Sequence, residues 1–263
     1  MITDAIRAGV RAQTALRVGI LCTVVAVSGA CSTKEAPGPL EPTGPTGRVR
    51  LVNLITDATR GRVNVSLEGL AFTVDLQYAQ AAPINLLPTA PYAAVYTGNR
   101  AFVLKRTADT TVTVATLSFS IADGQDRTIY AIGGTGGSAV SSVVTTDDNP
   151  AAAPTETRLR IVNMSPTAGA VDIFVTAVGA DLSTATARAS GLAYQAASAY
   201  FTVPPGAYQV RAVPAGTSAA NRGSSVVINL ATTTFAGGTG RTIVLADNST
   251  GGSPLRAFVI ADR

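Results

Sequence analysis

The stretch Arg-Val-Arg-Leu-Val-Asn-Leu at residues 48–54 recurs 110 residues later as Arg-Leu-Arg-Ile-Val-Asn-Met at residues 158–164. Further matches follow in the same order, namely Tyr78 with Tyr194, Tyr92 with Tyr208, Arg127-Thr128-Ile129 with Arg241-Thr242-Ile243, and Asp147 with Asp262. A preserved order with slightly drifting spacing indicates an internal repeat. The sequence therefore predicts one module present twice, over residues 48–147 and 158–263, joined by a linker at residues 148–157.

Within each repeat the apolar residues alternate with polar ones. Val63, Val65 and Leu67 alternate with polar residues, and Leu117, Phe119 and Ile121 do the same. Such a period of two is typical of strands with one buried face. Gly, Pro and Asn interrupt these runs about every ten residues, as in sandwiches and barrels. We therefore predict an all-β protein with two tandem antiparallel β-sandwich domains, immunoglobulin-like or transthyretin-like.

Three motifs of the second repeat carry a family resemblance. They are the opening Arg158-Leu159-Arg160-Ile161-Val162-Asn163-Met164-Ser165-Pro166, the following Val171-Asp172-Ile173, and the later Val203-Pro204-Pro205-Gly206-Ala207-Tyr208. Together they resemble a bacterial family of domains of unknown function, numbered 4397. The resemblance implies exported β-sandwich modules and no established catalytic residue. The first repeat departs from the pattern, with Leu87-Pro88 and then Pro91-Tyr92 where the second has Val203-Pro204 and its glycine.

Residues 1–30 have the pattern of a secretory signal. Three arginines and one acid precede an uncharged run from Val18 to Thr33, which is shorter than the roughly 20 apolar residues that span a bilayer. Its end, Val27-Ser28-Gly29-Ala30-Cys31, resembles the bacterial lipoprotein signal. That resemblance implies cleavage between Ala30 and Cys31, acylation of Cys31, and, from Ser32, delivery to the outer membrane. An ordinary cleaved signal and an uncleaved membrane helix stay open as alternatives.

Residues 31–47 are rich in proline and glycine and predict a flexible tether between the membrane and the repeats. No cysteine follows Cys31, so we expect no disulfide within the two repeats. The chain has no histidine and two cysteines, which excludes a Ser-His-Asp site, a histidine-ligated metal and a four-ligand Cys/His zinc site. The formal charge of +4 includes +2 from residues 1–30, and a nearly neutral remainder is a poor partner for nucleic acid.

Several polar groups have both a functional and a structural interpretation. The glycines of residues 133–137 and 237–240 lack the lysine or the helix of a phosphate loop and predict turns. Asp147-Asp148-Asn149 offers oxygens for Ca²⁺, but a solvated linker accounts for them better. For Asn163 and Asp172 we expect bonds to backbone rather than catalysis. Asp172, Asp181 and Asp247 have no sequence context that pairs them as in a glycosidase.

The arginines and tyrosines are the other candidates for binding. The Arg-x-Arg motifs at Arg48/Arg50 and Arg158/Arg160 could bind an anionic glycan or a lipid headgroup, but solubility and edge protection on a first strand are favoured. Four tyrosines could stack on a sugar, although packing is favoured because no tryptophan accompanies them: Tyr92, Tyr96, Tyr200 and Tyr208.

From the sequence we expect a non-enzymatic protein without cofactor or metal. It would be anchored in the bacterial cell envelope through Cys31, at the outer membrane and facing the surface, as a structural or interaction module. Its partners would be the membrane and a surface glycan or protein. A lipoprotein that binds a glycan or small ligand is the alternative, and a hydrolase is the least favoured class.

Overall fold

The computed structural model describes residues 44–83 and 91–262. The predicted signal, Cys31 and most of the predicted tether lie outside the described residues. Both repeats belong to one unit that spans residues 37–263. The described residues form strands and two 3-10 turns of three residues each, η1 (Thr135–Gly137) and η2 (Ala219–Asn221).

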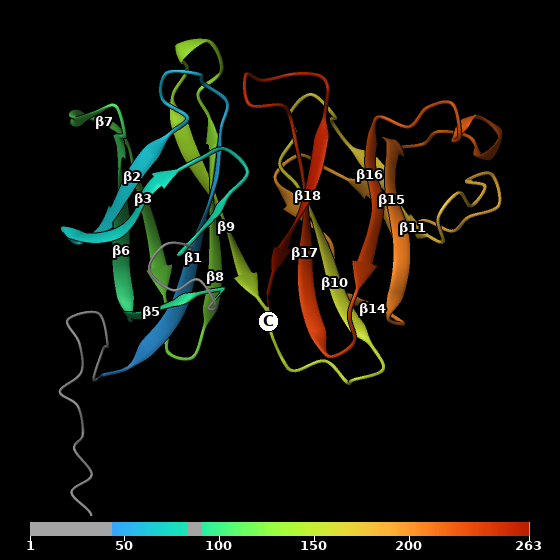
Figure 1. Ribbon diagram of the computed structural model, residues 1–263, viewed down its shortest axis with the longest axis horizontal. Helices are drawn as coiled ribbons and strands as arrows, with labels where there is room; N and C mark the ends of the chain where they lie inside the picture. Colours follow the sequence, from blue (N-terminus) through green and yellow to red (C-terminus); the bar gives the residue numbers. More distant parts are fainter. Residues whose placement is uncertain (1–43, 84–90, 263) are drawn as a thin grey trace, which may run out of the picture. The chain divides into compact units, whose positions relative to one another are not determined.

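Each repeat is built from two sheets, and Figure 1 shows the first repeat in blue to green and the second in yellow to red. In the first repeat, one sheet contains β1 (Thr46–Ile55), β4 (Ala81–Ala82), β5 (Ala93–Tyr96), β8 (Asp126–Gly133) and β9 (Val140–Asp147). Its second sheet contains β2 (Val63–Leu67), β3 (Leu70–Leu76), β6 (Gly98–Arg106) and β7 (Asp109–Ile121).

The second repeat has the same topology, with every strand number raised by nine. One sheet contains β10 (Thr157–Asn163), β13 (Ala196–Ala197), β14 (Phe201–Val203), β17 (Thr239–Ala246) and β18 (Arg256–Ala261). The other contains β11 (Val171–Thr176), β12 (Ala189–Leu192), β15 (Gly206–Pro214) and β16 (Ile228–Phe235). The predicted all-β fold with two tandem sandwiches is confirmed.

The pairing is antiparallel except for one pair of strands in each repeat. β1 runs parallel to β8, with Arg50 opposite Thr128, and β10 runs parallel to β17, with Arg160 opposite Thr242. Alternation along a strand gives no information about the direction of its partner, so the sequence did not indicate these pairs. Parallel strands are usually buried on both faces, and this holds here.

The half-buried strands follow the predicted alternation. Val63 and Val65 are buried in β2, and Leu117, Phe119 and Ile121 are buried at the end of β7. They pack with one face of β1 in the core cluster of the first repeat. The second repeat has a separate core cluster of its own.

β1 and β10 differ from the expected half-buried strand, because both of their faces are covered. Val49 and Leu51 of β1 face the core of the first repeat, whereas Val52 and Leu54 belong to a third cluster that includes Val162 of β10. This third cluster contains residues of both repeats and forms the apolar part of their interface. We call the β1 and β10 sheets the inner sheets, because their second faces meet there.

Candidate functional site

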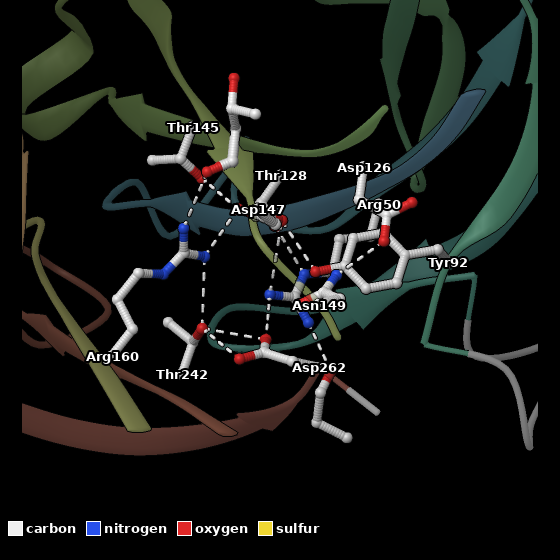
Figure 2. Close-up of polar contacts among 12 residues, drawn as sticks. Arg50, Tyr92, Asp126, Thr128, Thr145, Asp147, Asn149, Arg160, Thr242 and Asp262 are labelled. Carbon is white, nitrogen blue, oxygen red and sulfur yellow. Dashed lines mark hydrogen bonds and ion pairs between the residues drawn. The ribbon is translucent and has the colours of Figure 1, made fainter. Parts of the chain in front are cut away.

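The densest group of buried charges lies at the interface of the two inner sheets. We call it the inter-repeat cluster; its members are Arg50, Thr128 and Asp147 of the first repeat with Arg160, Thr242 and Asp262 of the second. Figure 2 shows the side chains pointing toward one another from both repeats. All six residues are at least nine-tenths buried.

Arg50 extends from β1 to the end of the second repeat. Its Nη2 donates to Oδ1 of Asp262 at 2.6 Å, and its Nη1 donates to the carbonyl oxygen of Ala261. Its Nε donates to Oγ1 of Thr128 at 2.7 Å, on the neighbouring strand of its own sheet. The guanidinium thus joins a strand of one repeat to the last described residues of the other.

Arg160 makes the reciprocal connection. Its Nη2 lies 2.7 Å from Oδ1 of Asp147, which ends β9 of the first repeat. Its Nη1 donates to the carbonyl oxygen of Thr146 at 3.2 Å, and its Nη2 donates to Oγ1 of Thr242 at 3.3 Å. Each repeat therefore supplies one arginine and one carboxylate to the other.

The two threonines connect each arginine to a carboxylate of its own repeat. Oγ1 of Thr128 accepts from Arg50 and donates to Asp147. Oγ1 of Thr242 accepts from Arg160 and donates to Asp262 at 2.8 Å. The four charges then sum to zero, and each ion is hydrogen-bonded, as a buried pair requires.

Aromatic rings cover both guanidinium groups. Cζ of Arg50 lies 4.5 Å from the ring centroid of Tyr92, and Cζ of Arg160 lies 4.8 Å from that of Tyr200. The hydroxyl of Tyr92 also donates to Oδ2 of Asp147 at 2.7 Å. These distances are typical of cation–π contacts, which add to the ion pairs in a desolvated site.

Burial controls the protonation of these groups. It raises the pKa of Tyr92 well above its usual value, because the phenolate would be desolvated, so the hydroxyl stays a hydrogen-bond donor. Burial works to lower the pKa of each guanidinium, but interactions with its neighbours, the carboxylates among them, outweigh that effect, and the pKa of Arg50 and Arg160 is raised. Both arginines therefore stay charged.

The preferred interpretation of the Arg-x-Arg motifs is wrong for Arg50 and Arg160. β1 and β10 lie inside their sheets rather than at an edge, and the two side chains are 1% and 2% exposed. Arg48 is half exposed and binds Asp126 through two bonds of 2.7 and 2.5 Å. The first arginine of the motif thus faces solvent in part, and the second one serves the interface.

The triplet Asp147-Asp148-Asn149 is only partly the solvated linker that the sequence predicts. Asp147 is buried with Arg160, whereas Asp148 is exposed and pairs with Arg158 at 3.0 Å. Nδ2 of Asn149 donates to Asp126 at 2.8 Å. Among the described residues no group of three or more His, Cys, Asp or Glu could hold a metal ion.

The expected backbone contacts of Asn163 and Asp172 are present. Nδ2 of Asn163 donates to the carbonyl oxygens of Gly169 and Leu192, and the carboxylate of Asp172 accepts from the amides of Gly191 and Gly216. Asp181 and Asp247 likewise accept hydrogen bonds from neighbouring loop residues, such as Ser183 and Ser165. These carboxylates therefore hold loops in place.

The structure corrects the sequence match of Tyr92 with Tyr208. Tyr92 precedes β5, and Tyr200 precedes β14, the equivalent strand, so Tyr200 and not Tyr208 is the counterpart of Tyr92. The registers of β6 on β2 and of β15 on β11 make Gly98 equivalent to Gly206 of the Val-Pro-x-Gly-x-Tyr motif, so the first repeat does have that glycine. The segment from Tyr78 to Tyr92 is longer than the equivalent segment from Tyr194 to Tyr200. The sequence match assumed equal lengths and therefore paired Tyr92 with Tyr208.

Sequence reasoning did not identify the inter-repeat cluster, although its signal was present. Asp147 and Asp262, and Thr128 and Thr242, all stood among the repeated positions. Polar residues repeated at the same positions of two copies indicate a shared contact. What they contact became clear only from the packing of one repeat on the other.

A small pocket lies further along the same interface, with Tyr78 and Tyr194 among its lining residues. Its volume is about 40 Å³, enough for a few water molecules and too small for a monosaccharide.

Comparison with protein families gives a match that spans both repeats. The model of the family described as "Domain of unknown function (DUF4397)" matches residues 47–174 and 176–263, so that both repeats are covered. Comparison with curated proteins gives no match.

Solved structures of similar chains include two sugar-binding proteins. One is a family 26 carbohydrate-binding module of Eubacterium rectale in complex with maltoheptaose, with 8% identity, a TM-score of 0.23, and coverage of 83% of this chain and 97% of the other. The other is a streptococcal virulence factor described as binding α-glucan, with 9% identity, a TM-score of 0.22, and coverage of 80% and 98%. Superpositions this loose say nothing about a ligand of this chain.

Proposed function

This chain belongs to the DUF4397 family, and from that premise we propose that it is a non-enzymatic module of the bacterial cell envelope. Its two sandwiches act as one rigid body that is held near a membrane by a lipid on Cys31. The module presents its outer surfaces to other envelope components. Two observations support the proposal: the N-terminal signal pattern, and the pairing of the buried charges between the two repeats.

The observation that carries the non-enzymatic part is the inter-repeat cluster. General acid–base chemistry needs a buried ionisable group that faces a substrate. Here both buried arginines and both carboxylates face each other across the interface, and their exposed fractions are no more than 5%. The cluster therefore supports a structural role, in which it holds the two repeats in one orientation.

Lipid anchoring rests on the sequence around Cys31. The thiol would form a thioether to the lipid, the signal would then be cleaved between Ala30 and Cys31, and two or more acyl chains suffice for stable anchoring. Among the described residues no helix is long and apolar enough to span a membrane. Outer-membrane delivery and surface exposure belong to the same proposal and rest on Ser32 and on the tether.

Metabolic labelling tests the anchor. We expect the full chain, expressed in a bacterium fed an alkyne fatty acid, to become labelled and to fractionate with the envelope. Cys31→Ser removes the label, because no thioether can form. Cys22→Ser is the matched control and keeps it, since Cys22 leaves with the signal. Undiminished labelling of Cys31→Ser would refute the anchor.

Glycan binding is the second candidate, and Tyr96 favours it. Tyr96 is 46% exposed on β5, and Nε of Arg100 donates to its carbonyl oxygen at 3.0 Å. An exposed ring beside a charged side chain is a common way to contact a sugar. Binding to a panel of envelope polysaccharides that is lost in Tyr96→Ala and kept in Tyr208→Ala would support it. No binding by the intact chain would reject it.

A further inference from the structure

The inter-repeat cluster is nearly symmetric, because each member has a counterpart at the same strand position of the other repeat. Arg50 and Arg160 stand opposite Thr128 and Thr242 in equivalent parallel pairs. Asp147 stands opposite Asp126, and the amide of Asp262 donates to the carbonyl oxygen of Gly240, the equivalent position. Two equivalent surfaces that contact each other reciprocally form a self-complementary interface.

The apolar part of the interface is matched in the same way. Val52 of β1 corresponds to Val162 of β10, and Leu54 corresponds to Met164; all four belong to the shared cluster. Tyr78 and Tyr194 pack against this cluster from equivalent turns. Each repeat thus carries a complete docking surface, with its own arginine, carboxylate and apolar residues.

The two repeats could separate without losing their own cores. The core cluster of the first repeat contains residues of that repeat alone, and the same is true of the second. The direct connection is the segment between the end of β9 at Asp147 and the start of β10 at Thr157. Opening the interface would expose the shared cluster and the four charges, which a second chain could cover again.

We propose that two copies of this chain pair by exchanging repeats, so that the inner sheet of the first repeat docks on the second repeat of the other chain. The contacts Arg50–Asp262 and Arg160–Asp147 then form between chains. The partner is a second copy of this chain, whatever its location in the cell. In the native chain the short linker gives the internal partner a high effective concentration, so the monomer is the main form.

Complementary charge reversal tests the exchange. Arg50→Asp places two carboxylates together, and Asp262→Arg places two guanidinium groups together, so each variant alone loses thermal stability. Refolded as a mixture, they can pair Asp at 50 of one chain with Arg at 262 of the other, and the native Arg50 with the native Asp262. We expect a species of twice the chain mass by native mass spectrometry, with a melting temperature above that of either variant.

The chain with both substitutions is the control. It restores the pair internally, so we expect a folded monomer. If that chain folds and the mixture gives only single-chain masses, the exchange is refuted.

A second variant keeps the test decisive if the reversed pair does not fold. Removing Pro150, Ala151 and Ala152 shortens the linker and leaves the inter-repeat cluster intact. We expect a dimer by light scattering, with the strand signal of the native chain in circular dichroism. A monomer from the shortened chain would contradict the proposal.

Discussion

At the scale of residues, the buried ion pairs of the inter-repeat cluster have large and opposing free-energy terms. Removing charges from water costs several kcal/mol per ion, and close pairing recovers that cost only if every donor and acceptor is bonded. Arg50 and Asp262 meet this condition through Thr128, Thr242 and the carbonyl oxygen of Ala261. A single truncation therefore has a greater effect than replacement of both partners.

Asp262→Ala removes the 2.6 Å carboxylate partner of Arg50 and leaves its buried guanidinium with only the more distant Asp147, at 3.8 Å. We expect the free energy of unfolding, measured by urea titration, to fall by about 3–5 kcal/mol. The double variant Arg50→Met, Asp262→Leu should recover most of that loss. Asp75→Asn is the matched control, because it breaks the exposed pair with Arg62 and should cause no measurable change. Equal effects of Asp262→Ala and the control would contradict the assignment.

Tyr130 is fully buried, and its hydroxyl has no hydrogen-bond partner among the described residues. Tyr130→Phe removes this unsatisfied group, so we expect the free energy of unfolding at pH 7 to rise by about 1 kcal/mol. Chemical denaturation measures the change. A loss of stability would show that the hydroxyl is bonded in solution.

The same tyrosine predicts a pH dependence. Burial raises the pKa of Tyr130 from its usual value near 10 to about 12, so the folded state holds the proton more tightly than the unfolded chain. The contribution of the protonated Tyr130 to the free energy of unfolding is fully present below pH 10 and is lost as the pH rises through 12. Tyr130→Phe should reduce the slope between these values by about 1.4 kcal/mol per pH unit. An unchanged slope in alkaline denaturation would contradict the shift.

At the scale of elements, each of the strands β1 and β10 contributes to two apolar clusters at once, one on each of its faces. In β1, alternate residues face the core of the repeat and the interface with the other repeat. This accounts for the nearly continuous apolar run broken by Arg50 and Asn53. Asn53 satisfies backbone groups, since its Nδ2 donates to the carbonyl oxygens of Gly61 and Leu76. A strand of this kind cannot tolerate a shift of one residue.

The linker lies against the second repeat, where the amide of Gly238 donates to the carbonyl oxygens of Ala153 and Glu156 and Gly237 leaves room for the close approach. A Cβ at this position would lie 1.9 Å from the carbonyl oxygen of Pro154, so Gly237→Ala must displace the linker or the turn before β17. We expect a loss of about 1–3 kcal/mol in the free energy of unfolding. Gly223→Ala is the control, because its Cβ would meet nothing within 4 Å. Equal stability of the two variants would show that Pro154 does not lie this close to Gly237 in solution.

At the scale of the whole molecule, the shared apolar cluster and the four charges couple the two sandwiches. We expect both repeats to unfold in one calorimetric transition, with equal calorimetric and van't Hoff enthalpies. Asp262→Ala weakens the coupling and should separate the transition into two. Two transitions in the native chain would mean that the interface adds little to stability.

The cysteine pattern gives a second prediction at this scale. Both cysteines of the chain, Cys22 and Cys31, precede the first repeat. We therefore expect reducing agents to leave the melting temperature unchanged. A lower melting temperature after reduction would reveal a disulfide.

The sequence alone determined the duplication, the β-sandwich class and the family, because each depends on local patterns. Period-two alternation, turn residues and repeated motifs are read along the chain without knowledge of its packing. Tertiary structure alone decided the role of Arg50 and Arg160. An arginine on the second face of a strand has the same sequence pattern whether that face meets water or an opposing carboxylate. What distinguished the two was a contact between positions more than 200 residues apart, from Arg50 to Asp262.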